Sequence, residues 1–291
     1  MSQSGSVAPP PEAMRKGIGS GVFATVVVVV LVVSLLAGVE IGKAAYGTSS
    51  TAKSQYLVVG TNIPFPPFED YNYSNGVYFG FDIDFAHMIA NATGRTLVIQ
   101  NYADFSVLLT TVGEGGVDVA ASAITESGPV GAARNATMSF SDTYYSANQA
   151  LLVKSSSTIT CANTANCVAS DLKTLKVGVQ TGTTSQGWAF QFLFPNETSG
   201  KISNYTTVDT EVAALEAGSL DAVIIDTGPA ASIAAGSSGA LKVAGTIITG
   251  ELYGFAVAHG DPEKLLPVIN QVITTSMSNG VYAKLIKKWF G

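Results

Sequence analysis

The feature that most constrains this chain is an uncharged apolar run at residues 17–39, which reads GIGSGVFATVVVVVLVVSLLAGV. An α-helix rises about 1.5 Å per residue, so this run is long enough to cross the roughly 30 Å hydrocarbon core of a bilayer. It is too long for a single buried strand. Arg15 and Lys16 lie directly before it, and basic residues favour the cytoplasmic side of a membrane. We therefore expect a cytoplasmic N-terminus at 1–16, a transmembrane helix at 17–39 and every later residue on the extracellular side.

A cleaved secretory signal is the alternative explanation of the same run. Signal peptides usually have a shorter apolar core, which favours a retained single-pass anchor in the cell membrane. Lys43 is followed by two alanines that would permit cleavage, and no cysteine directly follows the run, which excludes bacterial-type lipid anchoring. The small and polar residues 40–55 predict a linker. Under either interpretation, the remainder of the chain is exported.

Composition agrees with export and limits the possible partners. Residues 56–291 are enough for one bilobed protein or two modest domains, and they can bury a substantial core. The net charge is −6, only 12% of residues are charged, and no basic cluster follows the anchor, which argues against a nucleic-acid partner. Asn-x-Ser/Thr sequons predict surface glycosylation in an exported chain; they begin at Asn72, Asn91, Asn135, Asn196 and Asn204.

The chain has two cysteines, Cys161 and Cys167, in the segment CANTANC. Such a close pair could form a disulfide, half of a metal site, or two unrelated thiols. A metal site needs further ligands, and the two histidines, His87 and His259, lie far away in sequence. In an oxidising compartment we expect a structural disulfide that closes a small loop.

Beyond residue 55, strand patterns alternate with short helical ones. This alternation predicts parallel sheets with a ligand site at the carboxyl ends of their strands. An Asp-Ala/Val pattern recurs at Asp118 and Asp221 and suggests an internal duplication. The expected strands lie at 56–60, 97–99, 117–121, 176–179, near 202, 221–225 and 253–257; the expected helices begin near 81, 105, 185 and 211, and a helix pair covers 262–290.

A set of short sequence words makes a family resemblance specific. They are VGTNIPFPPFE (59–69), GFDIDFA (80–86), VDVAASAIT (117–125), FSDTYY (140–145), VGVQTGTTS (177–185), LDAVIID (220–226), YGFAVAHGDPE (253–263) and NGVYAKLIKKWFG (279–291). In this order and near this spacing, they resemble the extracytoplasmic solute-binding proteins, family 3, of polar amino-acid ABC transporters. The resemblance implies an α/β, two-lobed periplasmic-binding-protein-like fold (type II) with a central cleft. Lobe 1 would comprise 56–146 plus 251–291 and lobe 2 147–250, with crossings near 146–149 and 247–250.

The chemistry of a zwitterionic ligand supports the same assignment. A free amino acid needs a cation for its carboxylate and an anion for its ammonium group. Arg134 is the candidate cation, because its planar guanidinium can bind a carboxylate through two hydrogen bonds. Asp226, at the end of an apolar strand, is the candidate anion. On residue type alone, Arg134 could be a surface arginine and Asp226 a helix N-cap. The interval from Thr125 to Arg134 is also longer than in the family, with an insertion at 126–133.

The resemblance places further residues in the cleft. Thr183 and Thr184 stand in a loop whose backbone N–H groups and threonine hydroxyl would reach the ligand carboxylate. The hydroxyl of Thr125 and the backbone of Ala123 would add polar contacts. Phe65 occupies the position of an aromatic lid, although it could also be a core residue, which is our expectation for Trp188. The family commonly has Asp where this chain has Asn62, so a neutral polar or small amino acid is expected. The predicted binding residues are Asn62, Phe65, Ala123, Thr125, Arg134, Thr183, Thr184 and Asp226.

The resulting expectation is a receptor that closes on an amino acid and delivers it to an ABC permease and its ATPase, with no cofactor. The isolated histidines and the lack of an HExxH or Walker motif argue against an enzyme. A membrane-tethered ligand sensor or surface structural protein with the same fold is the main alternative. A dehydratase-like enzyme is a further alternative that rests on fold analogy.

Overall fold

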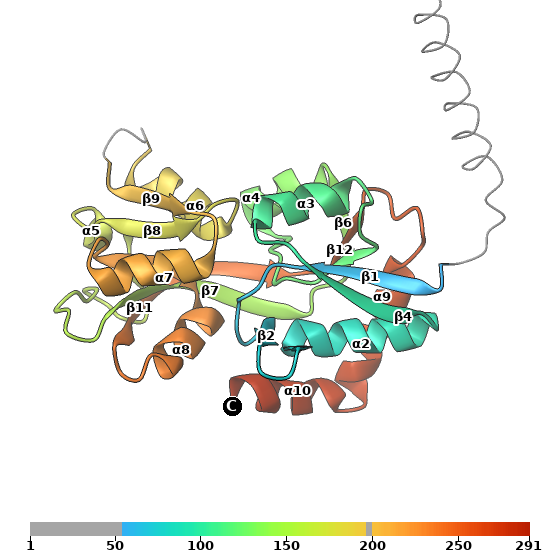
Figure 1. Ribbon diagram of the computed structural model, residues 1–291. Helices are drawn as coiled ribbons and strands as arrows, with labels where there is room; N and C mark the ends of the chain where they lie inside the picture. The colour runs from blue at the N-terminus through green and yellow to red at the C-terminus, as the bar shows by residue number, and fades with distance from the viewer. Residues whose placement is uncertain (1–53, 196–199) are drawn as a thin grey trace, which may run out of the picture. The chain divides into compact units, whose positions relative to one another are not determined.

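A computed structural model describes residues 54–195 and 200–291 (Figure 1). The expected cytoplasmic stretch, the transmembrane segment, nearly all of the linker and the sequon at Asn196 lie outside these residues. Within the described ranges, no helix is both long and apolar enough to cross a membrane. Residues 54–291 form one compact unit.

The first sheet is mixed. Its strand order is β4 (Thr96–Asn101), β1 (Tyr56–Thr61), β5 (Val119–Ala120), β12 (Ala256–Ala258), β6 (Met138–Phe140). The pairs β1–β4 and β1–β5 are parallel, whereas β12 is antiparallel to both β5 and β6. We call this sheet and its helices lobe 1; the helices are α2 (Phe81–Thr93), α3 (Phe105–Gly113), α4 (Gly128–Asn135), α9 (Leu266–Ser278) and α10 (Val281–Phe290). A short hairpin, β2 (Asp70–Asn72) and β3 (Val77–Phe79), precedes α2.

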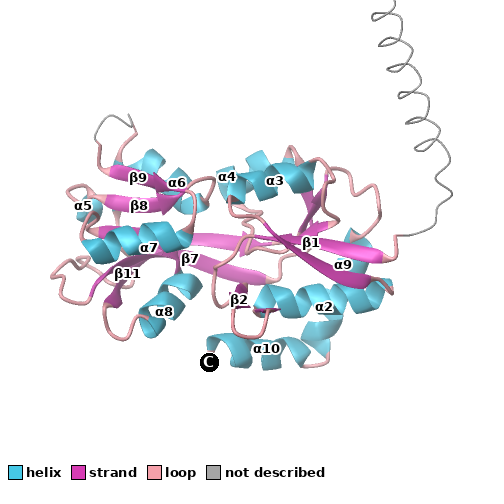
Figure 2. Cartoon of the chain, viewed as in Figure 1, coloured by secondary structure: helices cyan, strands magenta, loops and turns pink. Residues whose placement is uncertain are grey.

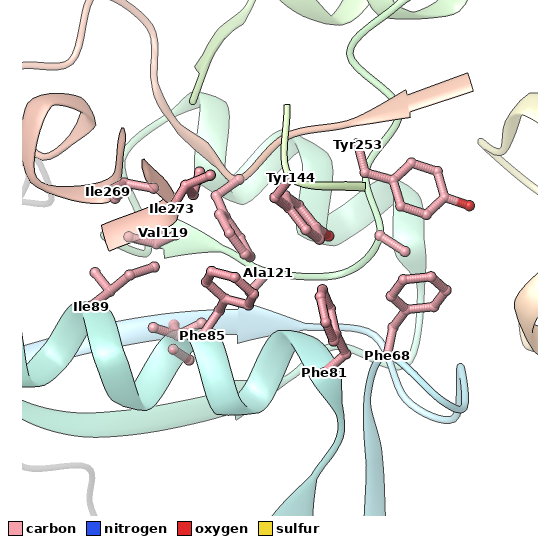
Figure 3. Packing of buried hydrophobic residues seen from close by; sticks show 14 of the residues in the cluster. Phe68, Phe81, Phe85, Ile89, Val119, Ala121, Tyr144, Tyr253, Ile269 and Ile273 are labelled. Carbon is pink, nitrogen blue, oxygen red and sulfur yellow. The ribbon is translucent and has the colours of Figure 1, made fainter. Parts of the chain in front are cut away.

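Aromatic and aliphatic side chains fill the core of lobe 1. Phe81 and Phe85 on α2 point toward Tyr144, and Ile89 points toward Val119, in Figure 3. Burial of such side chains gives each about 1.5–3 kcal/mol of favourable transfer free energy, which holds α2 against the sheet. The helix ends as expected at Gly94, which has φ of 68° and can adopt this left-handed conformation without a Cβ clash.

The second sheet has the strand order β11 (Leu241–Tyr253), β7 (Tyr145–Lys154), β10 (Ala222–Asp226), β8 (Val177–Gln180), β9 (Ile202–Tyr205). Strands β8, β9 and β10 run parallel, and β7 is antiparallel to its two neighbours. We call this sheet and its helices lobe 2 (Figure 2). The helices are α5 (Ala169–Leu172), α6 (Thr184–Trp188), the π-helical turn η1 (Ala189–Leu193), α7 (Val208–Ala217) and α8 (Thr227–Gly236).

Strands β7 and β11 continue from lobe 2 into lobe 1, side by side (Figure 1). Their pairing is shifted between Ile247 and Glu251, resumes with Glu251 opposite Ala147 and ends with Tyr253 opposite Tyr145. In lobe 1, the backbone of β11 binds the segment after β5, since Glu126 N–H donates to Leu252 O at 2.8 Å. These two strands therefore connect the two sheets, and the expected crossings at 146–149 and 247–250 lie within them.

The observed secondary structure differs from the one expected from the sequence in the inserted segment and near the second crossing. The insertion at 126–133 forms most of α4, a helix that its Gly, Pro and Ala residues did not predict. The strand expected at 253–257 is split, because Tyr253 ends β11 and β12 begins at Ala256. Gly254 separates them where a Cβ atom would lie 3.2 Å from Phe140 and 3.3 Å from Glu126.

The repeated Asp pattern has a structural counterpart in both lobes. The Asp118 carboxylate accepts from the N–H of Val58 at 2.7 Å, and the Asp221 carboxylate accepts from the N–H of Lys176 at 2.7 Å. In each lobe, an aspartate just before one strand thus accepts a backbone hydrogen bond from near the start of the neighbouring parallel strand. The equivalent positions are consistent with the predicted internal duplication.

Cys161 and Cys167 form the expected disulfide, with their Cα atoms 5.2 Å apart. Both cysteines are buried in the core of lobe 2. The loop they close is bound to β11, because Cys167 N–H donates to Thr246 O and Thr246 N–H donates to Thr164 O. The disulfide therefore fixes a loop against one of the two connecting strands.

Candidate ligand-binding site

All of the predicted binding residues line one cavity. They are Asn62, Phe65, Ala123, Thr125, Arg134, Thr183, Thr184 and Asp226. Phe105, Ser122 and Gln180 also line it, although the sequence did not lead us to predict them as binding residues. Lobe 1 supplies the residues up to Arg134, and lobe 2 supplies the others.

The ends of parallel strands place many of these side chains. Asn62 directly follows β1, Gln180 ends β8, and Asp226 ends β10. The carboxyl ends of parallel strands meet at one edge of a sheet, so residues far apart in sequence converge there. The position of Gln180 at such an end was a usable signal in the sequence.

Arg134 projects from α4 into the cavity and is only 7% exposed. Its Nη1 donates to Thr125 O at 2.8 Å, and its Nη2 donates to Gly182 O at 3.0 Å. The guanidinium lies 5.4 Å from the centre of the Phe105 ring. Burial lowers the pKa of Arg134 to about 10, which leaves it charged at neutral pH. Arg134 is thus not a surface arginine. Although the segment between Thr125 and Arg134 is longer than in the family, its folding into α4 brings Arg134 back into contact with Thr125.

Asp226 lies on the opposite lobe from Arg134 and is also buried. Burial, followed by the negative charge of Glu251, raises the pKa of Asp226 to about 7. Its Oδ1 accepts a short hydrogen bond from the Tyr253 hydroxyl. Asp226 does occupy the N-cap position of α8, but its side chain makes no capping bond within the described residues. The carboxylate is therefore directed to the cavity region.

The two loop threonines use their hydroxyl protons within the protein. Thr183 Oγ1 donates to Gln180 O at 2.7 Å and accepts from Gln186 N–H, which caps α6. Thr184 Oγ1 donates to Glu251 at 2.8 Å. In this arrangement, neither hydroxyl has a proton to offer a ligand carboxylate, a difference from the role that the resemblance implies.

Two amide side chains meet across the cavity. Gln180 Nε2 from lobe 2 donates to Asn62 Oδ1 from lobe 1 at 2.9 Å. Asn62 Nδ2 donates to Tyr102 O at 2.6 Å. The neighbouring Phe65 and Phe105 add aromatic surface to the same cavity. The uncharged part of the site is thus polar at the amides and apolar at the rings.

Two buried carboxyl groups support the loop that carries Ser122 and Ala123. Ser122 Oγ donates to Glu69 at 2.7 Å, and Ala123 N–H donates to Asp82 at 2.9 Å. Burial raises the pKa of Asp82 to about 7, and burial with the charge of Asp82 raises the pKa of Glu69 well above its ordinary range. These bonds hold Ala123 at φ of 47°, a left-handed conformation that is uncommon for alanine.

The cavity is too small for an amino acid in this conformation. The space that the centre of a water molecule can occupy is about 20 Å³, which corresponds to one or two waters. The Arg134–Gly182 and Gln180–Asn62 hydrogen bonds close it from both lobes. An amino acid therefore needs more space than the cavity offers in this conformation.

Residues outside the cavity also match parts of the sequence interpretation. Trp188 is partly buried against the core of lobe 2, as expected for a core residue. The sequon asparagines within the described residues are all exposed; they are Asn72, Asn91, Asn135 and Asn204. Their glycosylation stays a prediction.

Comparisons with known proteins agree with this geometry. The family described as bacterial extracellular solute-binding proteins, family 3, matches residues 57–291. The probable histidine-binding protein of Neisseria gonorrhoeae is 29% identical over 252 residues, covering 86% of this chain and 88% of that protein. The L-cystine-binding protein TcyJ of Escherichia coli K12 is 27% identical over 264 residues, covering 90% and 93%.

Solved structures show the same fold. An ancestral arginine-binding protein bound to arginine has a TM-score of 0.70 and 31% identity, covering 82% of this chain and 99% of its own. AncCDT-1, an ancestral amino-acid-binding protein described as a precursor of cyclohexadienyl dehydratase, has a TM-score of 0.70 and 31% identity, covering 81% and 96%. This chain therefore belongs to the bacterial extracellular solute-binding proteins of family 3.

Proposed function

We propose that this protein binds the zwitterion of a free amino acid between its lobes and delivers it to an ABC permease. Arg134 takes the carboxylate, and Asp226 takes the ammonium group. The observation that carries the proposal is that a buried arginine on one lobe and a buried aspartate on the other line the same cavity. Among the described residues that line this cavity, only Arg134 carries a positive charge.

Binding proceeds with lobe movement about β7 and β11. The ligand enters when the lobes separate, and it replaces the direct Arg134–Gly182 and Gln180–Asn62 bonds when they close. A ligand that binds the closed form better shifts the population toward it. Closure then distinguishes the loaded receptor from the empty one for the permease.

The side chain of the preferred amino acid is neutral and polar. Asn62 and Gln180 present amides rather than carboxylates to the cavity, and an amide pairs well with another amide. Related structures include one ancestral arginine-binding protein in both an arginine-bound and a glutamine-bound form. We favour a small or amide-bearing ligand such as glutamine over a cationic one.

The apolar run at 17–39 is proposed to tether this receptor to the membrane, with the lobes on the extracellular side. The linker at 40–55 then sets how far the lobes reach toward the permease. A binding role, rather than catalysis, is the function we assign to the cavity.

Calorimetric titration of the full-length chain with each of the standard amino acids tests this function. We expect at least one to bind more tightly than about 1 mM, the weak end of specific affinity. Arg134→Ala and Asp226→Ala should each abolish binding while the circular dichroism spectrum is retained. Lys284→Ala and Glu216→Ala, at exposed positions, are the matched charge controls and should bind normally. Normal affinity in Arg134→Ala would remove the basis of the assignment.

A further inference from the structure

Glu251 lies in the connecting strand β11, and its side chain is buried with 5% exposure. Its carboxylate accepts from donors on several elements. Thr125 Oγ1 and Thr184 Oγ1 both donate to Oε2 at 2.8 Å. Gln149 Nε2 on β7 and Thr249 Oγ1 on β11 both donate to Oε1 at 2.8 Å. Glu251 thus joins one threonine from each lobe and both connecting strands.

The chemistry of this network fixes the direction of its hydrogen bonds. An ionised carboxylate only accepts, so Thr125 and Thr184 must each point their single hydroxyl proton at Glu251. Each hydroxyl oxygen can then only accept from any other group. Both threonines line the ligand cavity, one from lobe 1 and one from lobe 2. The negative charge of Glu251 also repels a negative charge on Asp226 and so helps to raise the pKa of Asp226.

We propose that Glu251 is a positioning residue of the binding site, which holds the Thr125 and Thr184 hydroxyls as hydrogen-bond acceptors for the ligand's ammonium group. This inference rests on the proposed amino-acid-binding function. It assigns the two threonines to the same end of the ligand as Asp226, and it leaves the carboxylate to Arg134 and backbone donors. Glu251 acts through the threonines and makes no direct ligand contact.

Glu251→Gln tests the proposal with little change in size. The amide has one acceptor oxygen and a donor nitrogen. Where the nitrogen replaces Oε2, Thr125 and Thr184 must turn their protons away and can direct them into the cavity. Where it replaces Oε1, Gln149 and Thr249 lose their acceptor, and the two threonines keep only a neutral one. The probes are L-glutamine and 4-carbamoylbutanoic acid, the same molecule without its α-amino group. Where another amino acid binds the wild type more tightly, it and its deaminated form replace them.

We expect Glu251→Gln to weaken binding of the amino acid by about ten- to a hundredfold, the usual effect of losing hydrogen bonds to a charged group. Displacement titration should show that the deaminated acid changes by less than about threefold, since it has no ammonium group to lose. A general distortion of the cleft would weaken both probes equally. The selectivity for the amino group therefore separates positioning from structural damage.

Two further variants sharpen the result. Thr249→Val removes a donor to the other oxygen of Glu251, away from the cavity lining, and should leave the selectivity unchanged. In a Thr125→Val, Thr184→Val background, adding Glu251→Gln should cost less than about threefold in affinity, because residues that act through each other are not additive. Each variant is used only if its unfolding curve shows a folded protein.

The outcomes distinguish the two proposals. If the wild type binds no amino acid, the proposed function fails and this inference falls with it. If the wild type binds but Glu251→Gln weakens both probes equally, or neither, only the role of Glu251 is overturned. Loss confined to the amino acid supports it.

Discussion

Replacing Asp226 with asparagine should stabilise the protein while it removes the ammonium-binding charge. Burial and the charge of Glu251 raise the pKa of Asp226 from its ordinary value of 3.8 to about 7. Each pKa unit corresponds to about 1.36 kcal/mol, so ionising this carboxyl costs the folded state about 4 kcal/mol. Asparagine carries no charge, and its oxygen can still accept from the Tyr253 hydroxyl. The variant therefore avoids the cost of a buried charge and keeps the hydrogen bond.

The sign of the pH dependence follows from this raised pKa. Below the ordinary pKa, the carboxyl is protonated in both the folded and unfolded states, and the wild type has its full stability. As the pH rises toward about 7, the unfolded state ionises while the folded state resists, so the wild type loses stability. The advantage of Asp226→Asn should thus grow from less than about 1 kcal/mol at pH 4 to about 4 kcal/mol at pH 8.

Urea unfolding of both full-length proteins without amino acid, at pH 4 and pH 8, measures this difference. Groups that do not interact with Asp226 titrate alike in the two proteins and cancel in the comparison. The charge of Asp226 contributes to the raised pKa of Glu69 and of Glu211, so its removal acts in the same direction at these two groups. Asp142→Asn, at an exposed position, is the control and should shift stability little at either pH. An equal gain for Asp226→Asn at both pH values, or a loss at pH 8, would refute the reasoning.

Two other perturbations probe the connection between the disulfide loop and β11. Changing both Cys161 and Cys167 to serine should lower the free energy of unfolding by about 2 kcal/mol, the value expected for so short a loop. A reductant should lower the free energy of unfolding of the wild type by the same amount and leave that of the variant unchanged. A wild type that is fully reduced but equally stable would contradict this. Gly245→Ala should cost about 1–3 kcal/mol, because its Cβ would overlap Cys167 Sγ and lie 3.1 Å from both Cys161 Sγ and Thr164 O. Gly236→Ala, in open space in α8, should instead gain up to about 1 kcal/mol, so equal thermal shifts in the two alanine variants would remove the steric argument.

Much of the fold could be predicted from the sequence, because its strand and helix patterns are local. The alternation after residue 55 predicted β1, α2 and α3 close to their observed bounds. The two Asp-Ala/Val patterns marked equivalent positions in both lobes. Every predicted binding residue lines the cavity. Asn62 and Asp226 lie there because they follow or end strands, whereas most of the other positions were predicted from the family resemblance.

What the sequence could not predict depends on contacts between distant segments. Glu251 and Gln149 stand among other polar residues of β11 and β7, so nothing local distinguishes them, and their meeting follows from the pairing of the two strands. The insertion is short and consists largely of Gly, Pro and Ala, so α4 and the return of Arg134 could not be derived from it. Gln180 was visible only as a strand end, and its partner Asn62 is 118 residues away.

The position of β12 in the first sheet has a consequence for how this protein folds. β12 lies between β5 and β6, and within the described residues β6 pairs with β12 alone. A chain emerging from its N-terminus therefore exposes an open edge on β5 until residues 256–258 arrive, after all of lobe 2. Such late closure between distant segments slows folding and leaves strand edges open to aggregation. Lobe 2 is thus free to fold first, and the half that begins the globular chain is completed last.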